Sequence, residues 1–416
     1  MTTYPLALAT ADEMREMDRA TIVEGGVPGI DLMETAGAGT AKALLALPPP
    51  SGPIVVMAGG GHNGGDALVA ARHLALAGRP CEVLLFAEPD QLPEDAKTNY
   101  DRLPSPVSVR RIGTETFGPA SEALRRAGTI VDGLFGTGLA REVGGIHAEA
   151  IRVANRSSAL RVALDMPSGV SSDTGQVLGV AFRADRTYTY GLAKLGQMLY
   201  PGAEFCGHLT TIDIGLPPSV VRRIGTDASC FHESQARRTI GRRKPDTHKG
   251  TYGHLLLVAG SPGKSGAAIL AAGAALRAGT GLVTVATDEA TRLALAARHP
   301  EAMTFALPPG DPPSQATALY NATLRMNAVV FGPGWGADDK NLLLLREAAL
   351  GRLDIPLLLD ADALTLAATG GMGFLLERSM HGGQTVLTPH PGEASRLLGT
   401  TTDETPSEAG TYVHIP

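Results

Sequence analysis

The chain has 416 residues, of which 44% are hydrophobic and 19% charged, with 51 glycines and 29 prolines. This length predicts two or three domains, each with a core of its own. The net charge of −6 argues against a basic nucleic-acid-binding surface. No apolar run reaches the roughly 18 residues of a spanning helix, and no signal-peptide pattern opens the chain. Three distant cysteines predict neither disulfides nor a zinc site. We therefore expect a cytoplasmic multi-domain enzyme that binds neither nucleic acid nor membrane.

Residues 10–47 show apolar side chains at helical spacing and predict two helices. A strand at 54–58, a glycine-rich turn at 59–65, a helix and a strand at 81–86 then form a βαβ unit. The same alternation continues through four further strand regions, at 128–139, at 160–170, in the segment RADRTYTYGLAKLG and at 208–217. This pattern predicts a doubly wound, Rossmann-like α/β domain over residues 1–217.

Residues 218–247 are polar and basic without apolar periodicity, and we interpret them as a linker. A second α/β pattern fills residues 248–416, with apolar segments at 254–260, 282–287, 327–336, 356–364 and 384–399. The last residues, TTDETPSEAGTYVHIP, contain no strand or helix pattern. We therefore expect this second domain to be incomplete.

The first glycine-rich turn contains G-x-G-x-x-G as Gly59, Gly61 and Gly64, and Glu82 follows about where a ribose-binding acid is expected. A dinucleotide-binding oxidoreductase is therefore one hypothesis. The turn continues as HNGGDA, however, and pyrophosphate binding does not need the acid Asp66 at this position. Phosphate binding at the helix N-terminus is predicted, and a capping role for Asp66 stays open.

Two further strands end in acidic turns. Asp132 ends the strand before Gly136, and Asp165 and Ser168 lie at the end of the strand region at 160–170. The carboxyl ends of parallel strands face the crevice in which α/β proteins bind ligands. Oxygen ligands of this kind suit a hard cation and leave room for an acid–base pair.

At this point the sequence resembles a known family. The segments GHNGGDALVAARHLALAG, VDGLFGTGL, ALDMPSGVSSDTGQ and ADRTYTYGLAKLG resemble the NAD(P)H-hydrate epimerase domain. The segments HKGTYGHLLLVAGSPGKSGAAILAAG, VVFGPGWG, LLDADAL and LTPHPGEASRLLG resemble the ADP-dependent NAD(P)H-hydrate dehydratase domain, which is ribokinase-like. Joined in this order, they resemble the bifunctional enzymes that repair hydrated nicotinamide nucleotides.

The resemblance implies a role for each matching position. It implies a potassium ion bound by Asn63, Asp132 and Ser168. It implies hydrated NADH or NADPH bound in the first domain by His62, Asn63, Gly64, Gly65, Asp66, Gly136, Thr137, Gly138, Leu139, Ala140, Arg141, Glu142 and Asp165. In the second domain it implies substrate contacts from Ala267, Gly334 and His390, with ADP or ATP and Mg²⁺ as cofactors.

Epimerisation of a hydrated nicotinamide needs a proton donor and acceptor beside the hydroxyl-bearing carbon, and no redox cofactor. We predict Asp165 as the general acid/base, with Lys194 and Asp185 as further candidates.

Members of the dehydratase family continue past the PHPGEASRLLG segment with a KG-x-x-T segment and a GG-[ST]-GD turn, which this sequence lacks. We therefore expect an active epimerase and an inactive dehydratase. Two alternatives stay open, the oxidoreductase and a non-catalytic nucleotide-binding scaffold, and the resemblance also implies a homo-oligomer.

Overall fold

The structure is a computed structural model that describes residues 6–49, 51–105, 107–231, 233–308, 311–351 and 354–401. It divides into two compact units, Met1–Ile240 and Gly241–Pro416. This division differs from the predicted linker over 218–247. In that range the structure forms α8 (Pro218–Ile224), β10 (Ala228–Cys230) and α9 (Glu233–Thr239). Val220 of α8 packs into a core cluster with α1, so this helix belongs to the first unit.

The first unit is built on a seven-stranded sheet in which every neighbouring pair is parallel. Its spatial order is β4 (Ser108–Arg111), β3 (Cys81–Leu85), β2 (Ile54–Ala58), β5 (Thr129–Gly133), β6 (Leu160–Leu164), β7 (Arg186–Tyr190) and β9 (His208–Ile212). All five residues of β2 and of β5 are buried, as expected for strands covered on both faces. The predicted doubly wound α/β fold is confirmed.

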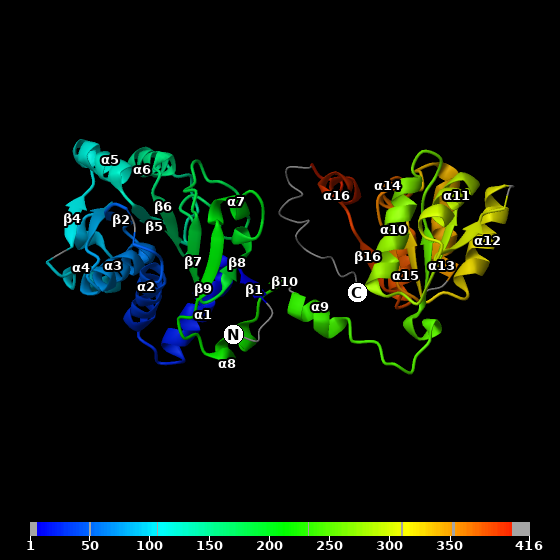
Figure 1. Ribbon diagram of the computed structural model, residues 1–416, viewed down its shortest axis with the longest axis horizontal. Coiled ribbons are helices and arrows are strands. Elements are labelled where there is room, and N and C mark those ends of the chain that lie inside the picture. The colour runs from blue at the N-terminus through cyan, green and yellow to red at the C-terminus, as the bar shows by residue number, and fades with distance from the viewer. Residues whose placement is uncertain are drawn as a thin grey trace. The chain divides into compact units, whose positions relative to one another are not determined.

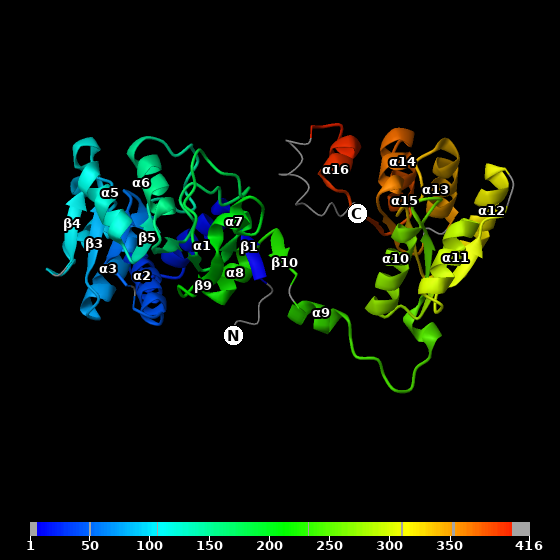
Figure 2. The same cartoon turned by 45° about the horizontal axis from the view of Figure 1, so that its top comes forward.

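Helices cover both faces of this sheet (Figures 1 and 2). One core cluster joins the sheet to α2 (Gly29–Leu45), α3 (His62–Leu76) and α4 (Glu94–Asp101). A second cluster, on the opposite face, joins it to α5 (Phe117–Arg126) and α6 (Gly145–Arg156). The sheet order reverses direction between β2 and β5, and such a switch point is where open α/β sheets bind ligands.

A small second sheet with the order β10–β1–β8 completes the first unit. Strand β1 (Leu6–Ala9) pairs antiparallel with β10 and parallel with β8 (Ala193–Lys194), so that Ala9 lies opposite Lys194. Helix α1 (Ala11–Val23) follows β1 at once and begins with a capping box formed by Thr10 and Glu13. The sequence patterns predicted neither β1 nor β10, because each has only three or four residues. Helix α7 (Gly202–Cys206) precedes β9.

The second unit has a six-stranded sheet that is also parallel throughout. Its order is β13 (Met303–Ala306), β12 (Leu282–Thr287), β11 (His254–Val258), β14 (Ala328–Phe331), β15 (Leu357–Leu359) and β16 (Thr385–Leu387). Its direction reverses between β11 and β14, which gives this unit a switch point of its own.

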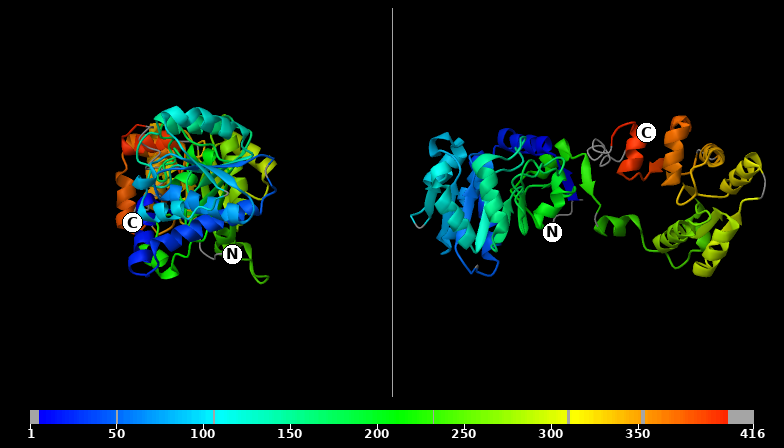
Figure 3. Two further views of the ribbon diagram at one scale, coloured as in Figure 1. Left: turned by 90° about the vertical axis from the view of Figure 1, so that its left-hand side faces the viewer. Right: turned by 90° about the horizontal axis from the view of Figure 1, so that it is seen from above.

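Two core clusters again show that helices lie on both faces of this sheet (Figure 3). One face carries α10 (Ser265–Ala278) and α11 (Glu289–Arg298), and the other carries α12 (Pro312–Thr323), α13 (Asp339–Gly351), α14 (Asp362–Gly370) and α15 (Gly373–Met380). Helix α16 (Pro391–Leu398) follows β16. The segment on which the predicted incompleteness rests, 402–416, lies outside the described residues. Within the described ranges, no helix is long and apolar enough to cross a membrane.

Candidate active site

The glycine-rich turn after β2 lies at the switch point of the first unit. A Cβ on Gly59 would stand 2.0 Å from the carbonyl oxygen of Leu134, and one on Gly64 would stand 2.0 Å from that of Gly59. These two glycines are therefore required by the packing of the chain against itself. A Cβ on Gly61 would meet no atom within 4 Å. Among Gly59, Gly61 and Gly64, only Gly61 has open space at its Cβ position, and it lies at the N-terminus of α3.

Asn63, Asp132 and Ser168 come together at this switch point, as the sequence predicts. Asp132 is fully buried at the end of β5, and its carboxylate accepts hydrogen bonds from the backbone N–H (2.9 Å) and the hydroxyl (2.7 Å) of Ser168. Burial nevertheless raises the pKa of Asp132 to about 6. Asn63 donates to the carbonyl oxygens of Phe135 (2.9 Å) and Leu164 (3.1 Å).

The other amide atom of Asn63, Oδ1, is buried and has no hydrogen-bond partner among the described residues. Buried acceptors are nearly always paired. This orphaned oxygen, the hydroxyl of Ser168 and the carboxylate of Asp132 are oxygen ligands of the kind that suits a hard cation.

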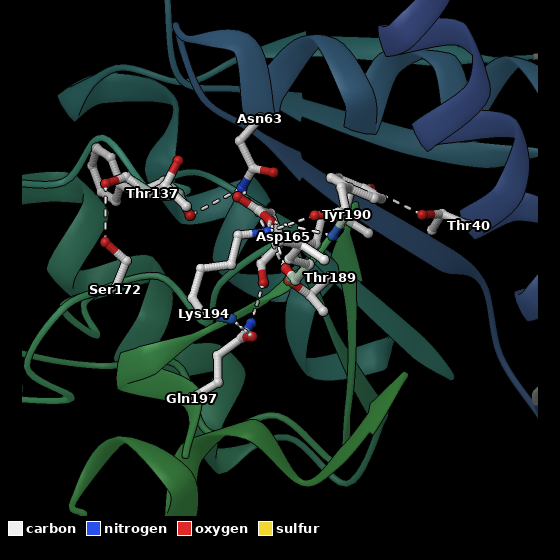
Figure 4. Close-up of polar contacts among 12 residues, drawn as sticks. Thr40, Asn63, Thr137, Asp165, Ser172, Thr189, Tyr190, Lys194 and Gln197 are labelled. Carbon is white, nitrogen blue, oxygen red and sulfur yellow. Dashed lines mark hydrogen bonds and ion pairs between the residues drawn. The ribbon is translucent and has the colours of Figure 1, made fainter. Parts of the chain in front are cut away.

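Asp165 and Lys194 form the centre of the site (Figure 4). Lys194 is 1% exposed, and its Nζ lies 2.5 Å from Oδ1 of Asp165. The same ammonium donates to the hydroxyl of Thr189 (2.9 Å) and to the carbonyl oxygen of Tyr190 (2.8 Å). Its three protons are therefore all engaged.

Asp165 also has an unusual backbone conformation. Its φ of +60° is a left-handed value that non-glycine residues seldom adopt, and the side chain of Gln197 holds it by donating to its carbonyl oxygen (2.6 Å). Backbone strain of this kind, about 1–3 kcal/mol, is found at functional sites. A Cβ on Gly136 would stand 3.3 Å from Oδ2 of Asp165 and from Asn63. Gly136 therefore lets the loop after β5 lie against both side chains.

Two more carboxyl groups lie near this ion pair. Burial, reinforced by the negative charges of Asp165 and Asp18, raises the pKa of Asp66 well above its usual range. Burial likewise raises the pKa of Asp18 to about 6, with the charge of Lys194 acting in the opposite direction and that of Asp165 in the same direction. Besides Asp132, the site thus has the carboxyl groups of Asp165, Asp66 and Asp18 and the ammonium of Lys194, which is paired with Asp165.

The remaining predicted residues of this unit lie on the two loops around the pair. His62 is exposed at the start of α3, followed by the buried Gly64 and Gly65. The loop that runs from Gly136 through Thr137, Gly138, Leu139, Ala140, Arg141 and Glu142 is half-buried to exposed. The hydroxyl of Ser172 donates to the carbonyl oxygen of Thr137 (3.3 Å) and ties this loop to the one after Asp165 (Figure 4).

The structure does not bring Asp185 to the site. Asp185 precedes β7, at the opposite end of that strand from Tyr190, and forms an ion pair with Arg161 (2.8 Å). Glu82 also lies away from the predicted ribose position. It is the second residue of β3, not the residue after its carboxyl end, and it pairs with Arg110 at 3.0 Å.

Sequence analysis did not single out Thr189, Tyr190, Gln197, Thr40 or Asp18. The buried hydroxyls of Thr40 and Tyr190 lie 2.9 Å apart, although 150 residues separate them. No short-range pattern links such residues, because helices α1 and α2 carry Asp18 and Thr40 to the site from far along the chain. Thr189 and Tyr190 lay in the segment ADRTYTYGLAKLG, which was already under consideration for Lys194 and Asp185, and Gln197 follows that segment directly.

The switch point of the second unit brings together two of its three predicted residues. A Cβ on Gly334, whose φ is +63°, would stand 2.8 Å from that of Ala267. Lys264 forms an ion pair with Asp362 (3.1 Å), whose Oδ2 also accepts the backbone N–H of Gly336 (2.8 Å). His390 follows the carboxyl end of β16, at the same edge of the sheet, and caps α16 by accepting from the N–H of Gly392 (3.1 Å).

Fold and site together define an α/β protein with two parallel sheets, each with a switch point, and with a buried ion pair of Asp165 and Lys194 in the first unit. The family model described as "YjeF-related protein N-terminus" matches residues 29–196, and that described as "NAD(P)H-hydrate dehydratase" matches residues 255–412. The chain is 38% identical to bifunctional NAD(P)H-hydrate repair enzymes of Thermofilum pendens and Moorella thermoacetica, over 96% and 95% of this chain and 75% of each relative. The chain belongs to this family of bifunctional NAD(P)H-hydrate repair enzymes.

Among solved structures, the second unit is similar to an ADP/ATP-dependent NAD(P)H-hydrate dehydratase from Bacillus subtilis that was co-crystallised with ATP/Mg²⁺. The match has 29% identity and a TM-score of 0.34, over 42% of this chain and 57% of the other. Family membership confirms the resemblance found in the sequence and replaces the oxidoreductase hypothesis.

Proposed function

We propose that the first unit interconverts the R and S forms of hydrated NADH or NADPH. The observation that carries this proposal is the buried ion pair of Asp165 and Lys194 at the switch point. The family to which the chain belongs supports it, because its members are named for the repair of hydrated NAD(P)H.

The proposed reaction moves protons and one water molecule, without oxidation. The hydroxyl on the carbon beside the ring nitrogen takes up a proton and leaves as water, while the nitrogen lone pair forms a C=N⁺ bond. Water then adds to the other face of this planar carbon and gives up a proton. One group must donate a proton and another accept one, on opposite sides of the ring.

The residues of this chain fit these two roles. Asp165 forms a buried ion pair with Lys194, which fixes its carboxyl group in place to accept the proton of the incoming water. Burial and the negative charges of Asp165 and Asp18 raise the pKa of Asp66, so this carboxyl group is suited to protonate the leaving hydroxyl. In the reverse direction each group performs the opposite step.

We further propose that a potassium ion binds at the oxygens of Asn63, Asp132 and Ser168. The orphaned Oδ1 of Asn63 supports this assignment, since a cation would satisfy it. The ion would supply positive charge that orients the loop after β5. Asn63 and Ser168 would then hold the backbone of Phe135 in place beside Gly136.

For the second unit we propose a binding site for hydrated NAD(P)H at Ala267, Gly334 and His390, served by ADP or ATP with Mg²⁺. The close approach of Gly334 to Ala267 and the match to the dehydratase family support this. The inactive dehydratase expected from the sequence stays a prediction, as do the cytoplasmic location and the homo-oligomer.

An assay with separated R and S forms of hydrated NADPH tests the proposal. One arm measures their interconversion by chromatography, with potassium or sodium chloride. The other adds ADP and Mg²⁺ and measures recovered NADPH by its absorbance. We expect the wild type and the control Asp185→Asn to interconvert the epimers. Asp165→Asn should be at least a hundredfold slower, and equal rates in Asp165→Asn and the wild type would refute the assignment.

A further inference from the structure

Helix α1 places an acidic side chain against the turn that carries Tyr190 and Lys194. A Cβ on Gly191 would stand 3.2 Å from the methyl group of Met14, and Leu192 packs against the core cluster of α1. Asp18 follows Met14 by four residues and so lies on the same face of the helix. Asp18 therefore lies over the β7–β8 turn, close enough for the charges of Lys194 and Asp165 to act on it.

One oxygen of this side chain lacks a partner. Oδ1 of Asp18 is buried and accepts no hydrogen bond from the described residues. An unsatisfied buried acceptor destabilises the folded protein, so its presence calls for a donor from outside the chain.

Donors on α1 and on the segment that carries Tyr190 and Lys194 are engaged with other described residues. The ammonium of Lys194 donates its three hydrogen bonds to Asp165, Thr189 and Tyr190. The hydroxyl of Tyr190 is paired with that of Thr40. On α1 itself, Thr21 donates to the carbonyl oxygen of Met17, and Arg19 donates to Glu16. No rotation of these side chains frees a donor for Asp18 without breaking another bond.

We propose that Asp18 is a substrate-contacting residue of the epimerase site, whose Oδ1 accepts a hydrogen bond from the hydrated nicotinamide ring. This inference rests on the proposed function, because that ring would lie beside Asp165 and Asp66. The ring carries two kinds of donor, the hydroxyl on the reacting carbon and the N–H₂ of the carboxamide. Either would satisfy the orphaned oxygen and fix the ring between the proton donor and the proton acceptor.

The test compares the full chain with Asp18→Ala, Asp18→Asn and the control Glu16→Gln. Glu16 lies on the same helix, but it is exposed and paired with Arg19. Steady-state epimerisation is measured for each, and unhydrated NADPH, which keeps the carboxamide but lacks the hydroxyl, serves as a competitive inhibitor. Melting temperatures identify any variant that fails to fold. If Asp18→Ala does not fold, the near-isosteric Asp18→Asn still tests the inference.

We expect Asp18→Ala to lower kcat/KM at least tenfold, Asp18→Asn to lower it less, and Glu16→Gln to stay within twofold of the wild type. If NADPH inhibition weakens by the same factor, the donor is the carboxamide; if inhibition is unchanged, it is the hydroxyl. Folded Asp18 variants with wild-type kcat/KM would overturn the inference. A wild type without any epimerase activity would instead overturn the proposed function, and with it the basis of the inference.

Discussion

The Nζ atom of Lys194 and the Oδ1 atom of Asp165 lie 2.5 Å apart, and the two residues come from different sheets. Asp165 follows β6 of the large sheet, whereas Lys194 belongs to β8 of the small one. Their ion pair therefore joins the two sheets at the place where the chemistry is proposed. The stability of the first unit and the proposed reaction therefore both depend on this ion pair.

Lys194→Met is expected to destabilise the first unit by about 3–5 kcal/mol, because it leaves the buried carboxylate of Asp165 without its cation. Adding Asp165→Asn removes the stranded charge and should restore part of that loss. Chemical unfolding followed by far-UV circular dichroism measures both. The single tryptophan, Trp335, lies in the second unit, so its fluorescence provides the control transition. Equal stabilities of the single and double variants would contradict the prediction.

The turn after β2 offers a matched pair of glycine substitutions. Gly64→Ala forces a Cβ to within 2.0 Å of a backbone oxygen, so we expect a loss of at least about 2 kcal/mol and of activity. Gly61→Ala meets no atom of the protein and should leave the melting temperature within about 2 °C. If substrate phosphate lies against this turn, Gly61→Ala should raise KM alone. Thermal melts and steady-state kinetics separate these effects, and equal melting temperatures would refute the packing argument.

Asp18 should make stability depend on pH in a definite direction. Its pKa rises from 3.8 to about 6 on folding, so the folded state retains a proton that the unfolded state loses in this window. That contribution is complete below about pH 4 and is lost as the pH rises through 6. Relative to Asp18→Asn, the wild type should therefore lose about 3 kcal/mol between pH 4 and pH 7. Parallel stability curves for the two proteins would contradict this.

Asn63→Leu tests the cation site. This substitution keeps the volume but removes the orphaned Oδ1, and it also leaves the carbonyl oxygens of Phe135 and Leu164 without their donor. We expect epimerisation by the wild type to rise on replacing sodium with potassium, and that response to disappear in the variant. The matched control is Asp185→Asn, which should respond to potassium as the wild type does. A variant that keeps the potassium response would place the cation elsewhere.

Sequence patterns identified the elements that form the core of each unit. The buried apolar runs at β2 and β5 and the long helices α2 and α3 were predictable because their periodicity is local. The convergence of Asn63, Asp132 and Asp165 was also predictable, since all three lie at carboxyl ends of strands in one parallel sheet.

The failures have a common physical cause. Asp185 lies five residues before Tyr190 and Lys194 four residues after it, yet the five residues of β7 place Asp185 at the opposite edge of the sheet. Asp18 and Thr40 reach the site only through tertiary packing of α1 and α2, which periodicity does not specify. Strands β1 and β10 are too short to give a pattern, and they pair across more than 200 residues of chain.

The small sheet makes the first residues of the chain part of the chemistry. Strand β1 pairs with β8 on one side and with β10 on the other, and Ala9 lies directly opposite Lys194. A protein shortened past Ala9 would keep every strand of the seven-stranded sheet and every loop at its switch point. It would still lose the strand that pairs with Lys194, so we expect this shortening to disturb the ion pair with Asp165 although it removes neither residue.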